Sequence, residues 1–140
     1  MSAALSVRQV ESKADLRTFI TFPWTVYKGN PYWVPPFVSM QKHRLDQAHA
    51  AAWEYMEGDS FIAWRGEQPI GTITAFINHR YDEYWNERVG FFGMFEVLDD
   101  QEAASALLET AAGYVAAKGV TVLRGPASFS TNAECGVLID

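Results

Sequence analysis

Residues 89–97 read VGFFGMFEV, an almost continuous apolar run. Such a run predicts a central β-strand that is buried on both faces. Gly93 interrupts it, and a glycine inside a strand is costly unless the backbone bulges there or something approaches it closely. The sequence therefore predicts either a bulge or a close approach at Gly93.

A helix and another strand are predicted after this run. Residues 99–118 place apolar side chains on one helical face, and Gly119 follows as a terminator. We expect Asp99 to cap this helix and Glu102 to reach back in a capping box, so that carboxylates occupy the positive end of the helix dipole. Residues 120–123 then begin a further strand.

A β-hairpin is predicted before the run. Gly58 and Asp59 indicate a turn, after which residues 60–64 and 70–78 have the composition of two paired strands. The polar and aromatic residues 81–88 predict a loop between the hairpin and the central strand.

The N-terminal part is predicted to form a strand and two helices. Residues 5–10 alternate loosely and indicate a strand, and Ser12 with Asp15 is typical of a capped helix start. Residues 22–37 combine four prolines with six aromatic side chains, which predicts an ordered, packed connection. A second helix is expected over residues 37–45.

These elements occur in the order β-α-α-β-β-β-α-β. That order predicts an α/β (α+β) fold, in which helices flank a mixed central sheet. The chain of 140 residues is one domain's worth, so we expect a single domain over residues 1–140.

Composition and charge exclude several classes of function. A net charge of -6 disfavours nucleic-acid binding and contact with anionic membranes. The single cysteine, Cys135, cannot form an internal disulfide, which fits a cytoplasmic protein. No uncharged run approaches the ~18 residues of a membrane-spanning helix, so we expect a soluble protein.

Three stretches carry a resemblance to the GNAT acyltransferase superfamily, in particular to its uncharacterised bacterial GNAT-like branch. They are GNPYWVPPF, PIGTITAFINHRYDEYWNERVGFFGMFE and LRGPASFSTNAECGVLID, within a matching order of elements. The resemblance implies a GNAT-like fold, although its last helix and two strands have no room before Asp140. It also implies an acyl-CoA such as acetyl-CoA as the cofactor.

In the resembled fold the bulged strand pairs its main chain with the pantetheine arm of the coenzyme. Carried onto this sequence, the resemblance assigns that role to the main chain of Phe92, Gly93, Met94, Phe95 and Glu96. The next loop binds pyrophosphate in the family, but residues 98–105 lack the Gln/Arg-x-x-Gly-x-Gly/Ala pattern and are acidic. We therefore expect CoA esters to bind weakly.

Glu96 and His79 are the candidate catalytic residues. GNAT enzymes often place a carboxylate at the end of this strand to deprotonate the attacking amine, and Glu96 occupies that position. The alternative is a strand-end acid that faces solvent or caps the next helix. His79 stands between Asn78 and Arg80, where an imidazole could assist proton transfer or simply be polar surface.

Three other groups of residues are weaker candidates. His43, Asp46 and His49 have an imperfect spacing for a metal site, so we predict no metal. Cys135 is expected to be a buried, inert thiol. A set of aromatic side chains could wall an apolar or cationic ligand pocket or cover the end of the sheet: Trp24, Tyr27, Tyr32, Trp33 and Phe37.

Two functional interpretations stay open. One is an N-acyltransferase that moves an acyl group from acyl-CoA to an amine; the other is a non-catalytic module that binds a small molecule or serves in assembly. The uncharged segment 120–123 resembles an exposed strand edge, which the apolar tail 136–140 could cover by adding a strand to its own sheet or to a neighbour's. A two-fold partner would cover both this edge and the apolar face beside it, so we expect a homodimer.

Overall fold

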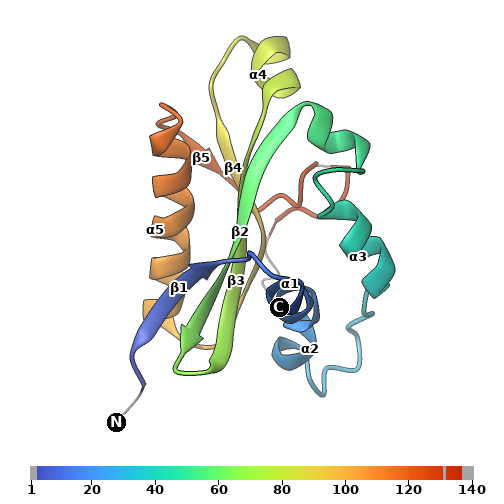
Figure 1. Ribbon diagram of the computed structural model, residues 1–140, viewed down its shortest axis with the longest axis vertical. Helices are drawn as coiled ribbons and strands as arrows, with labels where there is room; N and C mark the ends of the chain where they lie inside the picture. The colour runs from blue at the N-terminus through green and yellow to red at the C-terminus, as the bar shows by residue number, and fades with distance from the viewer. Residues whose placement is uncertain (1–2, 131, 137–140) are drawn as a thin grey trace.

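The computed structural model describes residues 3–130 and 132–136 and contains a five-stranded sheet with helices on both faces (Figure 1). The strands follow one another across the sheet in the order of the sequence, and pairing is antiparallel except between the last two. The elements are β1 (Leu5–Gln9), α1 (Lys13–Thr21), α2 (Pro23–Val26), α3 (Val38–Arg44), η1 (Ala51–Glu54), β2 (Met56–Arg65), β3 (Gln68–Asn78), α4 (His79–Trp85), β4 (Gly90–Val97), α5 (Gln101–Ala117) and β5 (Leu123–Arg124).

The α/β class and the order of strands and main helices are as the sequence predicts. Alternation along the strands divides the core between the two faces of the sheet. In β2, Ile62 packs against Phe19 and Ile20 of α1, whereas its neighbour Ala63 lies in the cluster that includes Leu107 of α5. Helices α1, α2 and α3 thus lie on one side of the sheet and α5 on the other (Figure 1).

The predicted bulge in β4 is confirmed. Thr74 of β3 pairs with Gly93 and Thr72 pairs with Glu96, so Met94 and Phe95 oppose a single residue of β3. Met94 has a positive φ of 46°, a backbone conformation that residues other than glycine rarely adopt. The bulge re-aims the end of β4 relative to its neighbours.

The close approach predicted at Gly93 is also present. A Cβ atom added there would lie 2.0 Å from the carbonyl oxygen of Ala127, in the segment that follows β5. The Ala127 N–H donates a hydrogen bond to the carbonyl of Phe92 at 2.9 Å. The Met94 N–H donates to Ser128 Oγ at 3.2 Å, so residues 127–128 pack directly on the bulged backbone.

Two predictions about the hairpin region are wrong. Gly58 and Asp59 are not a turn but part of β2, and Gly58 allows β3 to approach, since an added Cβ would lie 2.6 Å from the Ala75 carbonyl oxygen. The expected loop over residues 81–88 is largely the helix α4. Its start is capped by Asn78, whose side-chain oxygen accepts a hydrogen bond from the Tyr81 N–H at 3.0 Å.

The capping residues predicted from the sequence are correct at the start of α1 and wrong at the start of α5. The capping box of Ser12 and Asp15 is present at the start of α1. At α5 the cap is Asp100 rather than Asp99, and its side chain accepts from the Ala103 N–H at 3.0 Å. Glu102 makes no reciprocal cap there but pairs with Arg65, because the turn between β2 and β3 lies beside this loop.

The connection over residues 22–37 is only partly packed. Pro23 begins the short helix α2, and Trp33 lies against both Trp24 and Tyr27 with ring centroids 5.2 Å apart in each pair. The later part is open, since Tyr32 and Phe37 are 90% and 75% exposed. Aromatic composition alone does not distinguish these two halves.

The strand after α5 is shorter than expected. It covers Leu123–Arg124, while Val120 is buried before the strand begins and Val122 is 45% exposed. Residues 137–140 of the tail lie outside the described residues, and the homodimer stays a prediction.

We predict that Gly93→Ala destabilises the fold by about 3 kcal/mol, because the new methyl group would force β4 and residue 127 apart. Gly113→Ala is the matched control: nothing lies within 4 Å of its added Cβ in the helix α5, and alanine favours helices over glycine by about 1 kcal/mol. Urea unfolding of both variants measures the difference. Equal midpoints for Gly93→Ala and the wild type would contradict this account of the bulge.

Candidate functional site

A cavity of about 170 Å³ lies where the bulged end of β4 faces α1 and the aromatic connection after it. Thr72, Met94 and Glu96 come from the sheet, and Glu134 comes from the C-terminal segment. The remaining lining residues are Phe19, Ile20, Pro23, Tyr27, Trp33, Val34, Pro36 and Gln41. Four segments that are distant in sequence therefore build one partly apolar site.

Glu96 is the acidic group at the centre of this arrangement. It follows the bulge, and its Oε2 accepts a hydrogen bond from the Tyr27 hydroxyl at 2.8 Å. Tyr27 ends α2, and its ring stacks on Trp33 at 5.2 Å with an interplanar angle of 19°. The interpretation of Glu96 as a helix-capping acid is wrong, because the cap is Asp100, and the Glu96 side chain is partly buried rather than fully exposed to solvent.

The surroundings of Glu96 change its acidity. Burial raises the pKa of the Glu96 carboxyl, and the nearby Glu134 raises it further, while the hydrogen bond from Tyr27 opposes both effects. Burial and the contact with Glu96 raise the pKa of Tyr27 to about 12, so this phenol stays protonated as a donor. A carboxylate with a raised pKa in a cavity is a functional-site candidate.

The other predicted catalytic residue lies elsewhere. His79 begins α4, at the end of β3 where Ile77 pairs with Gly90, whereas Glu96 pairs with Thr72 near the start of β3. Its side chain is 59% exposed, and its Nε2 is 3.8 Å from a Glu57 carboxylate oxygen. The structure does not bring His79 and Glu96 together.

The loop before α5 is contacted by a cation that sequence reasoning missed, Arg65 at the end of β2. Arg65 donates from Nε and Nη2 to the two carboxylate oxygens of Asp100 at 2.7 and 3.1 Å, and from Nη2 to Glu102 at 2.7 Å. Arg65 and the Ala103 N–H lower the pKa of Asp100 to about 2. The acidic loop therefore has one internal counter-charge and is less negative than its own sequence implies.

The main-chain groups assigned to the coenzyme are partly engaged. The Phe92 carbonyl and the Met94 N–H already bond to residues 127 and 128. The Met94 carbonyl accepts a hydrogen bond from Thr72 Oγ1 at 2.9 Å. A ligand that pairs with β4 would thus have to use Phe95 and Glu96 or displace the C-terminal segment.

The remaining sequence candidates form no combined site. His49 Nδ1 lies 2.8 Å from Asp46, and the described residues contain no group of three His, Cys, Asp or Glu side chains placed to hold a metal. Cys135 is exposed, so the expectation of a buried thiol is wrong. Among residues 3–130 and 132–136, no helix is long and apolar enough to cross a membrane.

Two relatives in sequence each match nearly the whole chain. The chain is 32% identical over 135 residues to Protein YghO of Escherichia coli (strain K12), covering 96% of the chain and 34% of that protein. It is 30% identical over 139 residues to the bacterial ceramide synthase of Caulobacter vibrioides, covering 99% of the chain and 36% of that protein. The chain thus spans about a third of the length of these relatives, and no family model matches it.

Solved structures resemble the chain in fold. AAC(6')-Iy, in complex with a CoA-containing bisubstrate analogue, has a TM-score of 0.58 at 21% identity, covering 94% of this chain and 83% of that one. A GCN5-related N-acetyltransferase from Ralstonia eutropha gives 0.58 at 11% identity, with 89% and 84% covered. FeeM, an N-acyl amino acid synthase from uncultured soil microbes, gives 0.55 at 14% identity, with 84% and 68% covered. At these identities the likeness is one of fold, and the chain has the fold of the GNAT acyltransferases, as its sequence predicts.

Proposed function

We propose that this chain carries the catalytic site of an acyl-CoA-dependent N-acyltransferase, with Glu96 as the proton acceptor. The observation that carries the proposal is the partly buried Glu96, hydrogen-bonded to Tyr27 in a cavity at the end of the bulged β4. The GNAT fold, the name of one relative in sequence, a ceramide synthase, and that of one structural neighbour, an N-acyl amino acid synthase, support acylation as the reaction class.

The reaction needs a proton acceptor at the attacking nitrogen. The amine nitrogen attacks the thioester carbonyl carbon, and Glu96 takes a proton from that nitrogen directly or through water. The tetrahedral oxyanion then collapses, the carbon–sulfur bond breaks, and CoA leaves as a thiolate that takes up a proton. A main-chain N–H of the strand is the donor we assign to the oxyanion.

A proton acceptor must be basic and must be held in position, and the cavity provides both for Glu96. The raised pKa of Glu96 makes it a stronger base once it is ionised, while the Tyr27 hydroxyl holds the carboxylate in place and keeps it ionisable. The apolar walls that Phe19 and Trp33 contribute limit the access of water to the reacting atoms.

The acidic loop before α5 disfavours the pyrophosphate of the coenzyme. Asp99, Asp100 and Glu102 surround the helix start that would meet a pyrophosphate, and Arg65 balances one charge only. This observation favours the second candidate function, a small-molecule-binding module that does not turn over acyl-CoA. Either way, we expect the 140-residue chain to bind CoA esters weakly.

We predict that Tyr27→Phe raises the pKa of Glu96, because the ionised carboxylate loses a hydrogen-bond donor. Glu134→Gln is expected to lower the same pKa, because a repelling negative charge is removed. Carbon-detected NMR titration of the Glu96 side-chain carboxyl group measures both. Shifts of the same sign in the two variants would contradict the assigned environment.

We further predict that Glu96→Gln lowers any acyl transfer by about 100-fold or more, the usual contribution of a general base. The fold should stay intact, since glutamine keeps an acceptor for Tyr27 and removes a charge whose burial is unfavourable. The exposed Glu109→Gln on α5 is the matched control. Release of CoA thiol from acetyl-CoA with a panel of amines is the assay, and the wild-type rate should rise with pH as Glu96 ionises. Unchanged turnover in Glu96→Gln would remove Glu96 from the mechanism.

A further inference from the structure

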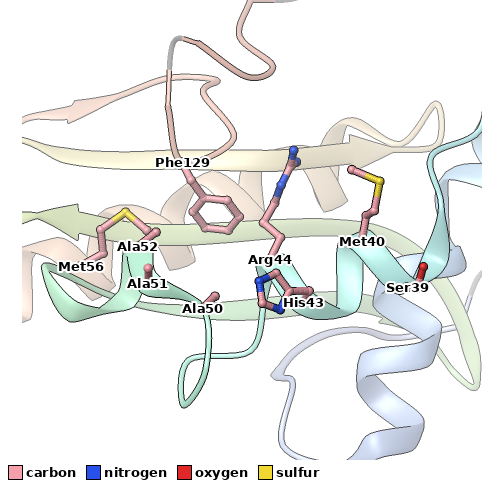
Figure 2. Close-up of a pocket in the computed structure, with 9 residues that line it drawn as sticks. All are labelled: Ser39, Met40, His43, Arg44, Ala50, Ala51, Ala52, Met56 and Phe129. Atoms are coloured by element: carbon pink, nitrogen blue, oxygen red, sulfur yellow. The ribbon is translucent and has the colours of Figure 1, made fainter.

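A second and larger cavity lies beside the first, between α3, η1 and the C-terminal segment. Its volume is about 520 Å³, within the range of small-molecule sites. Figure 2 shows its lining side chains, which come from four parts of the chain. They are Ser39, Met40, His43, Arg44, Ala50, Ala51, Ala52, Met56 and Phe129.

Most of this lining is apolar. Ala50 and Met56 belong to a buried hydrophobic cluster, against which the ring of Phe129 also packs. Phe129 is held in place by Trp53 and Phe76, with ring centroids 5.4 and 5.2 Å away. The cavity wall is therefore a fixed hydrophobic surface that would accept an alkyl chain.

Arg44 is the exception in the lining. It is the last residue of α3, and its carbonyl accepts a hydrogen bond from Trp53 Nε1 at 2.8 Å, which anchors its backbone. Its Nη1 atom is buried and has no hydrogen-bond partner within the described residues. A buried cationic donor without an acceptor is costly and indicates a missing partner.

The nearest carboxylate does not supply that partner. Glu134 Oε2 is 3.9 Å from Arg44 Nη1, beyond hydrogen-bond distance, and the Glu134 side chain is 67% exposed. The Arg44 side chain as a whole is 31% exposed and lines the cavity, so an incoming anion can pair with its guanidinium group in competition with Glu134. Arg44 and Phe129 both line this cavity (Figure 2), so the charged group and the apolar wall border the same space.

We propose that this cavity binds a single-chain amphiphile with an anionic head, of the fatty carboxylate class. The carboxylate pairs with Arg44, and the alkyl chain lies against Phe129, Met56 and the alanines of residues 50–52. Charge complementarity selects the head, and the apolar lining selects the chain. The proposal does not rest on acyl-CoA turnover, so its test stands whether or not Glu96 is catalytic.

Titration calorimetry of the 140-residue chain with sodium laurate below its micellar concentration tests the proposal. Laurate should bind, octanoate should bind more weakly because it buries fewer methylene groups, and acetate should not bind measurably. Dodecyltrimethylammonium has the same chain length with a positive head, and we expect it to bind at least about tenfold more weakly than laurate. Equal affinity for the two heads, or no laurate binding, would overturn the proposal without any variant.

Variants locate the site. Arg44→Met removes the guanidinium group but keeps an unbranched stem, and it should weaken laurate binding about tenfold or more. Lys42→Met, at an exposed position of the same helix, should leave laurate binding unchanged. Glu134→Gln should strengthen binding, because the competing carboxylate is removed. Ala51→Trp should block the cavity from an exposed position. Thermal unfolding checks that each variant folds; a folded Arg44→Met with wild-type affinity would show that laurate binds elsewhere.

Discussion

The contact between Gly93 and residue 127 is the constraint on which the rest of this molecule depends. With an oxygen atom only 2.0 Å from where a Cβ would lie, the two backbones can meet only because residue 93 has no side chain. This backbone contact places the C-terminal segment against β4 at the position of the bulge. From this one contact follow the direction of Glu96 after the bulge and the position of Glu134 and Phe129 near the helices on that face.

Both cavities are assembled by this arrangement, and the Arg44 and Glu134 pair adjoins each of them. Glu134 lines the cavity of Glu96, while Arg44 lines the larger cavity, and the two side chains approach to 3.9 Å. A ligand that draws Arg44 away from Glu134 would leave the Glu134 charge less neutralised. Glu134 is one cause of the raised pKa of Glu96, so that pKa would respond. Electrostatics therefore couples the proposed proton acceptor to the proposed amphiphile site.

The sequence was sufficient where local patterns and single-residue constraints determine the structure. The capping box at Ser12, the paired strands of the hairpin and the irregularity at Gly93 were all predictable. Gly58 was misassigned because a glycine that permits close strand contact looks the same in sequence as one that turns. The contacts of Tyr27 with Glu96 and of Arg65 with Asp100 join residues 69 and 35 positions apart. The hydrophobic periodicity of the sequence predicts helices and strands but not side-chain pairs at such separations. Only the register of β3 with β4 could have suggested that the turn after Arg65 lies beside the α5 start.

The most direct test of the central claim, that an acyl donor meets Glu96 on the bulged strand, is amide chemical-shift mapping by NMR with acetyl-CoA. Weak binding is no obstacle to this measurement. The account predicts concentration-dependent shifts at Phe95 and Glu96, beyond the two main-chain groups that residues 127 and 128 occupy, with a smaller response at Tyr27. Shifts confined to other surfaces, with Phe95 and Glu96 unchanged at saturating coenzyme, would contradict it.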